Sequence, residues 1–198
     1  MTQAVMDEDT ALIAAYRRGD DAAFATLIER HQTRIYRLAL GVLSSPQEAE
    51  DASQEALIAM FNSLPAFRGD SQFSTWLYRL TLNTCLKRRR VAPRGEQPLS
   101  AQVHTIPDSP GRAPDTHADR ALLRDRVARF LSALPDTYRI PVVLTDALDL
   151  PASEISAMLG LSLPAVKARI LRGRERLRAE IERYCQQAGL SGWRELLT

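Results

Sequence analysis

The stretch SEISAMLGLSLPAVKARILRGRERL, from Ser153 to Leu177, decides the fold of this chain. Its apolar spacing predicts two helices, about residues 152–159 and 163–183, separated by a turn at Gly160. Glycine permits the backbone conformation of a tight turn, and Ser162 is placed to cap the second helix. Two helices joined in this way are typical of a helix-turn-helix.

The second of these helices carries basic side chains on both sides of its apolar stripe. The stripe is predicted to be buried and consists of Leu163, Val166, Ile170, Gly173 and Leu177. The flanking basic residues are Arg169, Arg172 and Arg176 on one side and Lys167, Arg174 and Arg178 on the other. Such a helix fits the major groove of DNA between two phosphate backbones. The alternative is a helical hairpin whose arginines are only solvated.

Positive charge is concentrated in two segments of the sequence. The chain has 198 residues, with 26 Lys and Arg against 24 Asp and Glu and a net charge of +2. Residues 79–90 and 167–178 each carry a net +5, so the rest of the chain has a net charge of −8. Two basic patches on an acidic chain indicate two contacts with a polyanion. The simpler alternative is two solvated helix faces.

The composition argues against several classes of protein. The 45% apolar and 25% charged content is globular, and no apolar run approaches the ~18–20 residues of a membrane span. Cys85 and Cys185 lie far from each other and from the three histidines, so the spacing predicts neither a disulfide framework nor a zinc site. No nucleophile–base pair or phosphate-binding glycine loop is recognisable. We therefore expect a cytoplasmic protein without membrane insertion, without a cofactor and without enzymatic activity.

A proline-rich segment divides the chain into two helical parts. Residues 91–117 hold five of the 11 prolines, which predicts a flexible linker. Sustained alternating runs and hairpin turns are lacking on both sides, so we expect an all-α fold of two small, separately folded domains. The expected domains are residues 1–90 and 118–183, followed by a tail of unknown role, residues 184–198.

The first part is predicted to contain three helices with recognisable boundaries. One runs from Asp20 to Leu43, and the next begins at Ser45, where Glu48 is placed to complete a capping box, and stops at Pro65. After a short loop, a helix with an arc of basic and polar residues follows. In the second part, helices are also expected at 119–134 and, starting from a cap at Asp136, at about 136–148.

Five motifs occur in an order and spacing that match one known family. They are DASQEA from Asp51, FRGDSQFSTWLYR from Phe67, NT from Asn83, LPDTYR from Leu134 and VKARILRGR from Val166. Over about residues 10–183 the chain resembles the extracytoplasmic-function (ECF) group of bacterial RNA polymerase sigma factors. The resemblance implies a promoter-specificity subunit with a region 2-like bundle and a region 4-like helix-turn-helix domain. The alternative, a stand-alone helix-turn-helix repressor or activator, leaves the first 90 residues unexplained.

The resemblance also implies the partners and one docking surface. Asp51, Gln54, Glu55 and Ile58 match positions by which the family docks on the clamp coiled coil of core RNA polymerase. The flap of the polymerase, promoter DNA and, in many relatives, an anti-sigma factor are the other implied partners. Without the resemblance, an exposed acidic face on a nucleic-acid binder still indicates a protein partner, and the alternative is a solvated face.

The promoter contacts implied by the resemblance lie in two places. Those for the minus-ten element are Phe67, Arg68, Gly69, Asp70 and Ser71 in a base-capturing loop, and Trp76, Arg79, Asn83, Lys87 and Arg88 on the following helix. Those for the minus-thirty-five element are Ser162, Ala165, Lys167, Ala168, Arg169, Arg172, Arg174 and Arg176. Phe67 and Trp76 are also compatible with a packing role. Ala165 and Ala168 stand where Thr and Ser are frequent, so two hydroxyl contacts to DNA are missing.

Overall fold

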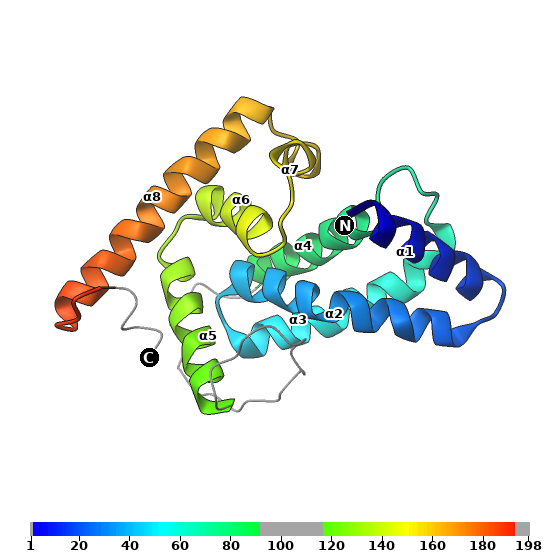
Figure 1. Ribbon diagram of the computed structural model, residues 1–198, viewed down its shortest axis with the longest axis horizontal. Coiled ribbons are helices and arrows are strands. Elements are labelled where there is room, and N and C mark those ends of the chain that lie inside the picture. The colour runs from blue at the N-terminus through cyan, green and yellow to red at the C-terminus, as the bar shows by residue number, and fades with distance from the viewer. Residues whose placement is uncertain (1, 92–116, 193–198) are drawn as a thin grey trace.

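The computed structural model describes residues 2–91 and 117–192, and every regular element in them is helical. The elements are α1 (Thr2–Arg17), α2 (Asp21–Leu43), α3 (Pro46–Ser63), the 3-10 turn η1 (Leu64–Ala66), α4 (Phe73–Val91), α5 (His117–Ser132), α6 (Asp136–Asp146), α7 (Ala152–Leu159) and α8 (Leu163–Gln187). The predicted all-α fold is confirmed, and Figure 1 shows the helices in their order along the chain. The proposed linker lies almost wholly outside the described residues.

Side-chain caps set the starts of α2, α3 and α8. The Asp20 carboxylate accepts from the amide of Ala22 at 3.1 Å and so caps α2. Ser45 caps α3 and Ser162 caps α8, each with its hydroxyl oxygen 3.4 Å from the amide three residues later. The prediction that Glu48 completes a capping box at the start of α3 is wrong. Its carboxylate does not reach back to the first turn of α3 but accepts a hydrogen bond from Arg88 of α4.

Helix α6 begins differently from the prediction. Pro135 occupies the cap position and offers no side-chain cap, while Asp136 lies in the first turn. The Asp136 carboxylate is instead shared by the guanidinium groups of Arg89 and Arg139. Pro141 stands inside the helix, which nevertheless continues to Asp146. The acid that was expected to start the helix therefore connects α6 to α4.

The first four helices form a bundle with its own apolar core. Its fully buried members include Leu27 and Ile35 from α2, Met60 from α3 and Leu77 from α4. Helix α1 closes this bundle through a buried polar contact, in which Nε2 of His31 lies 2.9 Å from a carboxylate oxygen of Asp9. The bundle places α3 and α4 side by side, with part of each helix exposed.

The two halves of the chain, which the sequence predicted as two domains, also share a second apolar core. Leu38, Val42, Leu82 and Cys85 of the first half belong to the same buried cluster as Ile140, Val143, Leu144, Ile155 and Ile170 of the second. Helix α6 packs on α2, as Figure 1 shows. The reason lies in residues 38–43, LALGVL, which are apolar on every side of α2. A helix segment that is apolar all round is stable only when other elements pack on all of its faces.

Close approach of α2 and α6 depends on Gly41. A Cβ atom at this position would lie 2.5 and 2.6 Å from the two methyl carbons of Val143. A polar link borders this contact, because Nη1 of the buried Arg139 donates to the Ser44 hydroxyl at 3.3 Å. Burial lowers the pKa of Arg139, and the neighbouring Arg89 acts in the same direction, opposed by Asp136. The contact between the halves is thus apolar inside and charged at its border.

The last turns of α8 pack on α5. Cys185 and Phe130 are buried together, and the Tyr184 ring meets the Phe130 ring edge-on at 5.4 Å. Helix α8 therefore extends to Gln187, four residues beyond the predicted end, and includes the first residues of the expected tail. The final residues, with Trp193, Leu196 and Leu197, lie outside the described part of the chain.

Candidate nucleic-acid interface

The turn between α7 and α8 is held by short-range contacts. Gly160 adopts a left-handed conformation with φ of 64°, as its predicted role in the turn requires. The hydroxyl of Ser156 donates to the carbonyl oxygen of Leu161 at 2.5 Å. Val166, Ile170 and Gly173 are buried, as expected, whereas Leu163 is 38% exposed, contrary to the prediction. These contacts fix the first turns of α8 relative to α7.

The basic residues of α8 fall into two groups. Lys167 and Arg172 are exposed and Arg169 is half-buried; the structure shows no ion pair for these three within the described residues. Arg174 is bound to Asp146, with Nε 3.2 Å from Oδ2, and the hydrogen bond and charge of Asp146 raise its pKa.

Arg176 and the two alanines complete the surface of α8. The Arg176 guanidinium lies over the Tyr138 ring, 4.8 Å from its centroid. Ser162 and Ala168 are exposed and Ala165 is half-buried. Among the predicted minus-thirty-five contacts, the positive charge without a local partner is therefore in the early turns of α8, where a helix entering the major groove presents its base-reading residues. Arg178, further along α8, is also exposed.

The loop before α4 combines an aromatic cluster with exposed polar residues. The Phe67 ring lies 5.1 Å from the Trp76 ring and 5.8 Å from the Phe73 ring, measured between centroids. Phe67 and Trp76 are both half-buried, which supports the packing alternative for them in this conformation. The exposed members of the loop are Arg68, Gly69, Asp70 and Ser71, and Gly69 has a φ of 82°. These four residues are available to a ligand.

Arg17, at the end of α1, is a contributor that the sequence reasoning missed. Its Nη2 group donates to the carbonyl oxygen of Phe67, and it lies 3.5 Å from the carbonyl oxygen of Leu64. The residue thus ties the backbone of this loop to the N-terminal helix. Helix α1 was not among the helices predicted from the sequence, and no sequence motif indicates this contact.

Helix α4 presents its predicted promoter-binding residues beside α7. Arg79, Asn83 and Lys87 are all exposed. Nη2 of Arg79 lies 3.4 Å from the carbonyl oxygen of Ala157, and the hydroxyl of Thr75 lies 2.7 Å from a carboxylate oxygen of Glu154. In this conformation α7 therefore covers the start of the α4 surface. The later part of that surface, around Asn83 and Lys87, remains exposed.

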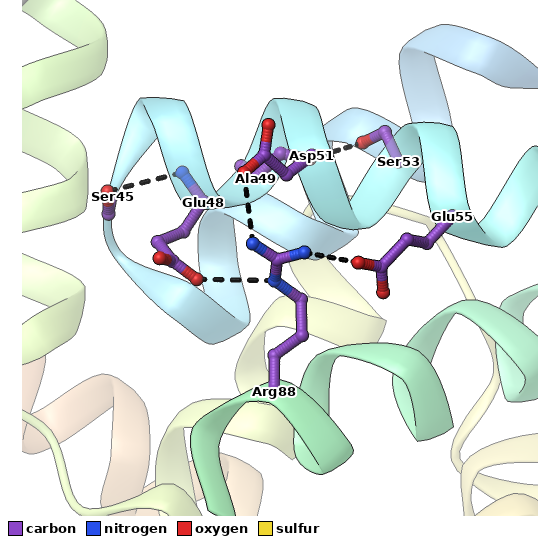
Figure 2. Close-up of polar contacts among 7 residues, drawn as sticks. All are labelled: Ser45, Glu48, Ala49, Asp51, Ser53, Glu55 and Arg88. Carbon is purple, nitrogen blue, oxygen red and sulfur yellow. Dashed lines mark hydrogen bonds and ion pairs between the residues drawn. The ribbon is translucent and has the colours of Figure 1, made fainter. Parts of the chain in front are cut away.

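Arg88 does not lie with the other candidate promoter contacts. Its guanidinium faces α3 and binds the carboxylates of Glu48, Asp51 and Glu55, as Figure 2 shows. Burial lowers the pKa of Arg88, but the hydrogen bond to Glu48 and the charges of Glu55 and Glu48 outweigh it, so the pKa is raised. The structure thus brings one predicted promoter contact together with two predicted polymerase contacts.

The predicted docking surface on α3 is exposed as a strip of mixed character. The side chains of Asp51 and Glu55 are 56% and 52% exposed, and Gln54 is also exposed. Ile58 follows on the same side of the helix and is 61% exposed. An acidic and apolar strip suits a protein partner with basic and apolar side chains and repels DNA.

The part of the chain that the structure describes holds neither a metal-binding cluster nor a membrane-spanning helix. Within residues 2–91 and 117–192, the structure shows no group of three or more side chains able to hold a metal ion. None of the helices in these ranges is long and apolar enough to cross a bilayer.

Comparison with known families gives a match in each half of the chain. The family described as "Sigma-70 region 2" matches residues 27–94, and the family described as "Sigma-70, region 4" matches residues 124–177. The first range contains α3 and α4, and the second contains the helix-turn-helix.

Curated relatives match nearly the whole chain. The RNA polymerase sigma-H factor of Pseudomonas aeruginosa is 31% identical over 193 residues, covering 92% of this chain and 98% of the relative. The ECF RNA polymerase sigma factor SigW of Bacillus subtilis is 32% identical, covering 85% and 94%. The ECF RNA polymerase sigma-E factor of Escherichia coli K12 is 31% identical, covering 88% and 94%.

Solved structures with the same fold also cover both halves. CnrH, in its complex with the cytosolic domain of CnrY, aligns with a TM-score of 0.67 and 28% identity, over 88% of this chain and 97% of that chain. The sigma factor RpoE of Bartonella quintana, in complex with the anti-sigma factor NepR, aligns with a TM-score of 0.62 and 21% identity, over 80% and 96%. The second match bears on the fold alone.

Proposed function

The chain belongs to the ECF group of sigma-70 factors, and from this membership we propose how its surfaces are divided between RNA polymerase and promoter DNA. It is an alternative sigma factor, which binds core RNA polymerase and directs transcription initiation at a set of promoters. The observation that carries this conclusion is the match of both halves in one chain. A stand-alone repressor would need only the helix-turn-helix. We assign the protein no catalytic chemistry, and we place it in the bacterial cytoplasm with the transcription machinery.

Helix α8 is our candidate for reading the minus-thirty-five element. Lys167, Arg169 and Arg172 project from its early turns, where they are available to bases and phosphates. A good bidentate contact with a base contributes ~1–3 kcal/mol of discrimination, and phosphate contacts make the binding depend on salt. Arg174 and Arg176 lie later and already have local partners, so we assign them to phosphates or to the support of α8.

The loop before α4 and the exposed part of α4 are our candidates for the minus-ten element. A loop with an exposed glycine backbone, Asp70 and Ser71 offers hydrogen bonds to the edge of an unstacked base. Arg79, Asn83 and Lys87 would then follow the melted strand along α4. Asn83 can both donate to and accept from a base edge. Gly69 keeps side-chain atoms away from this backbone, which allows close approach.

The acidic strip on α3 is our candidate for docking on the polymerase. Asp51, Gln54 and Glu55 supply carboxylates and an amide, and Ile58 adds an exposed apolar side chain. The strip lies on a different helix from the two promoter surfaces, so polymerase and DNA can be bound at the same time. Its negative charge favours a basic surface as partner.

Promoter binding requires the two halves to separate. The two promoter elements are named for centres about 25 base pairs apart, which is roughly 85 Å at ~3.4 Å per base pair. Helix α8, with 25 residues, is only about 37 Å long at ~1.5 Å per residue. While α7 contacts Thr75 and Arg79, α4 and α8 cannot reach both elements. We therefore propose that the conformation described here is a closed state that opens on the polymerase. An anti-sigma protein that holds the halves together would be an inhibitor of this step.

Two complementary variants test the division of surfaces. Arg172→Ala should reduce transcription from the cognate promoter roughly 5- to 150-fold, as expected for the loss of ~1–3 kcal/mol, and leave the affinity for core polymerase unchanged. Asp51→Ala combined with Glu55→Ala should weaken the complex with core polymerase instead. Affinity measurements with core enzyme and run-off transcription would separate the two effects. Loss of polymerase binding in the Arg172 variant, or undiminished binding in the double variant, would contradict the assignment.

A further inference from the structure

Arg88 links the helix that we assign to promoter DNA with the helix that we assign to polymerase docking. Resting on that proposed function, we infer that Arg88 is a positioning residue of the polymerase-docking surface and does not contact the promoter. Its guanidinium holds the carboxylates of Asp51 and Glu55, together with that of Glu48, in one arrangement.

The geometry gives each carboxylate its own nitrogen. Nε of Arg88 donates to Oε2 of Glu48 at 3.3 Å, Nη2 donates to Oδ2 of Asp51 at 3.0 Å, and Nη1 donates to Oε1 of Glu55. Figure 2 shows the guanidinium between the three acids, which all come from α3. A planar fork of donors can hold three acceptors in a fixed relation, which a single ammonium group cannot do.

The arrangement leaves the docking acids available to a partner. Asp51 and Glu55 each give one oxygen to Arg88, and their side chains stay more than half exposed. Their second oxygens are not engaged by Arg88 and can accept hydrogen bonds from cations of the polymerase. Arg88 itself is only 22% exposed, so it lies behind the acids.

Without Arg88 the three acids would repel one another. Glu48, Asp51 and Glu55 follow at spacings of three and four residues, so they share one face of α3. One guanidinium among three carboxylates leaves a net charge of −2 and removes the closest repulsions. With a neutral side chain in its place, the carboxylates would move apart. The polymerase would then have to order them at the moment of binding.

The same contacts argue against a role for Arg88 in binding DNA. A phosphate approaching the guanidinium would also approach three carboxylates, which repel it. Lys87, the neighbouring residue on α4, is exposed and lacks these acid partners, so it suits a phosphate better. Arg88 thus belongs to the α3 surface even though it is located on α4.

The test uses the full-length chain, core RNA polymerase and two charge-matched variants. Arg88→Gln removes the guanidinium that binds the three carboxylates, while Arg90→Gln removes an exposed cation from the same end of α4. Arg88→Gln should dissociate from core polymerase on the order of tenfold faster, without slower association, because the docking surface becomes more negative but less ordered. Arg90→Gln should stay within about twofold of wild type in dissociation. Once the polymerase complex is assembled, Arg88→Gln should bind promoter DNA as tightly as wild type.

Arg88→Lys separates geometry from charge. It keeps the positive charge and should fold, but it should dissociate at a rate between those of the wild type and Arg88→Gln. Thermal unfolding would reveal whether Arg88→Gln folds. If it does not, Arg88→Lys still tests the positioning role. Dissociation of Arg88→Lys at the wild-type rate would overturn the positioning role.

Other results would overturn the inference in distinguishable ways. Weaker promoter binding by the assembled Arg88→Gln complex, with unchanged polymerase kinetics, would return Arg88 to the promoter contacts. Equal effects of Arg88→Gln and Arg90→Gln would show a general charge effect. Undiminished polymerase binding by the Asp51 and Glu55 double variant would instead remove the docking assignment itself, and the role of Arg88 would be lost with it.

Discussion

Replacing Gly41 by alanine tests the contact that joins the two halves of the chain. The added Cβ would lie 2.5 and 2.6 Å from the Val143 methyl carbons, and 3.2 Å from the Val143 Cβ. Ordinary contact begins near 3.4 Å, so α2 and α6 must separate by about 1 Å. Val143 cannot easily turn away, because a β-branched side chain in a helix has one strongly preferred rotamer.

The expected cost follows from two opposing terms. Overpacking a core by one methyl group costs ~1–3 kcal/mol. Alanine in place of glycine in a helix contributes about 1 kcal/mol in the opposite direction. We therefore expect Gly41→Ala to lower the free energy of unfolding by about 1 kcal/mol, which shifts Tm by roughly 2–4 °C in a chain of this size. The radius of gyration in solution should increase as the closed state loses stability.

A double-mutant cycle with Val143→Ala makes the test specific. Val143→Ala removes the methyl groups that the new Cβ would meet, so the two substitutions together should destabilise less than their sum, by about 1–3 kcal/mol. Gly173→Ala is the matched control, because its Cβ would meet Val142 and Tyr138 within the second half. It should destabilise the protein without coupling to Val143→Ala. Additive effects of Gly41→Ala and Val143→Ala, with unchanged compactness, would refute the reasoning.

Two further predictions concern opening and a buried thiol. Energy transfer between dyes placed at the exposed positions Glu29 and Glu182 should fall when core polymerase and promoter are added, and unchanged transfer in a transcribing complex would show that the halves stay docked. Burial raises the pKa of Cys85 to about 12, from 9.0, so alkylation of this thiol at pH 8 should be much slower in the native than in the unfolded protein. The proton is held more tightly in the folded state, so the stability it contributes is complete below pH 9 and is lost as the pH rises toward 12. Unfolding of Cys85→Ala should accordingly depend less on pH between 9 and 12 than unfolding of the wild type.

Local signals allowed the sequence to predict the helices and the helix-turn-helix. Asp20, Ser45 and Ser162 are strong caps, and each starts the helix that was expected. The turn at Gly160 and the apolar spacing of α8 also depend on neighbours in sequence. Features that depend only on residues close in sequence can be predicted without the tertiary structure.

Features set by distant residues were predicted less well. Glu48 and Asp136 were expected to cap helices, but Arg88 and Arg89, far away in sequence, draw their carboxylates elsewhere. The shared core was also missed, although LALGVL at residues 38–43 shows that α2 needs cover on every side. Which helix provides that cover depends on the close approach at Gly41, and the sequence alone does not indicate this.

Run-off transcription with purified core polymerase on a library of promoter sequences tests the central claim most directly. The account predicts transcripts that require both the core enzyme and this chain, from templates that share two sequence elements at a fixed spacing. Arg172→Ala should lose the preference for the upstream element while some transcription from the downstream element persists. Transcription that is no higher than with core enzyme alone, or tight binding of the free chain as a dimer to two-fold symmetric DNA, would contradict the account.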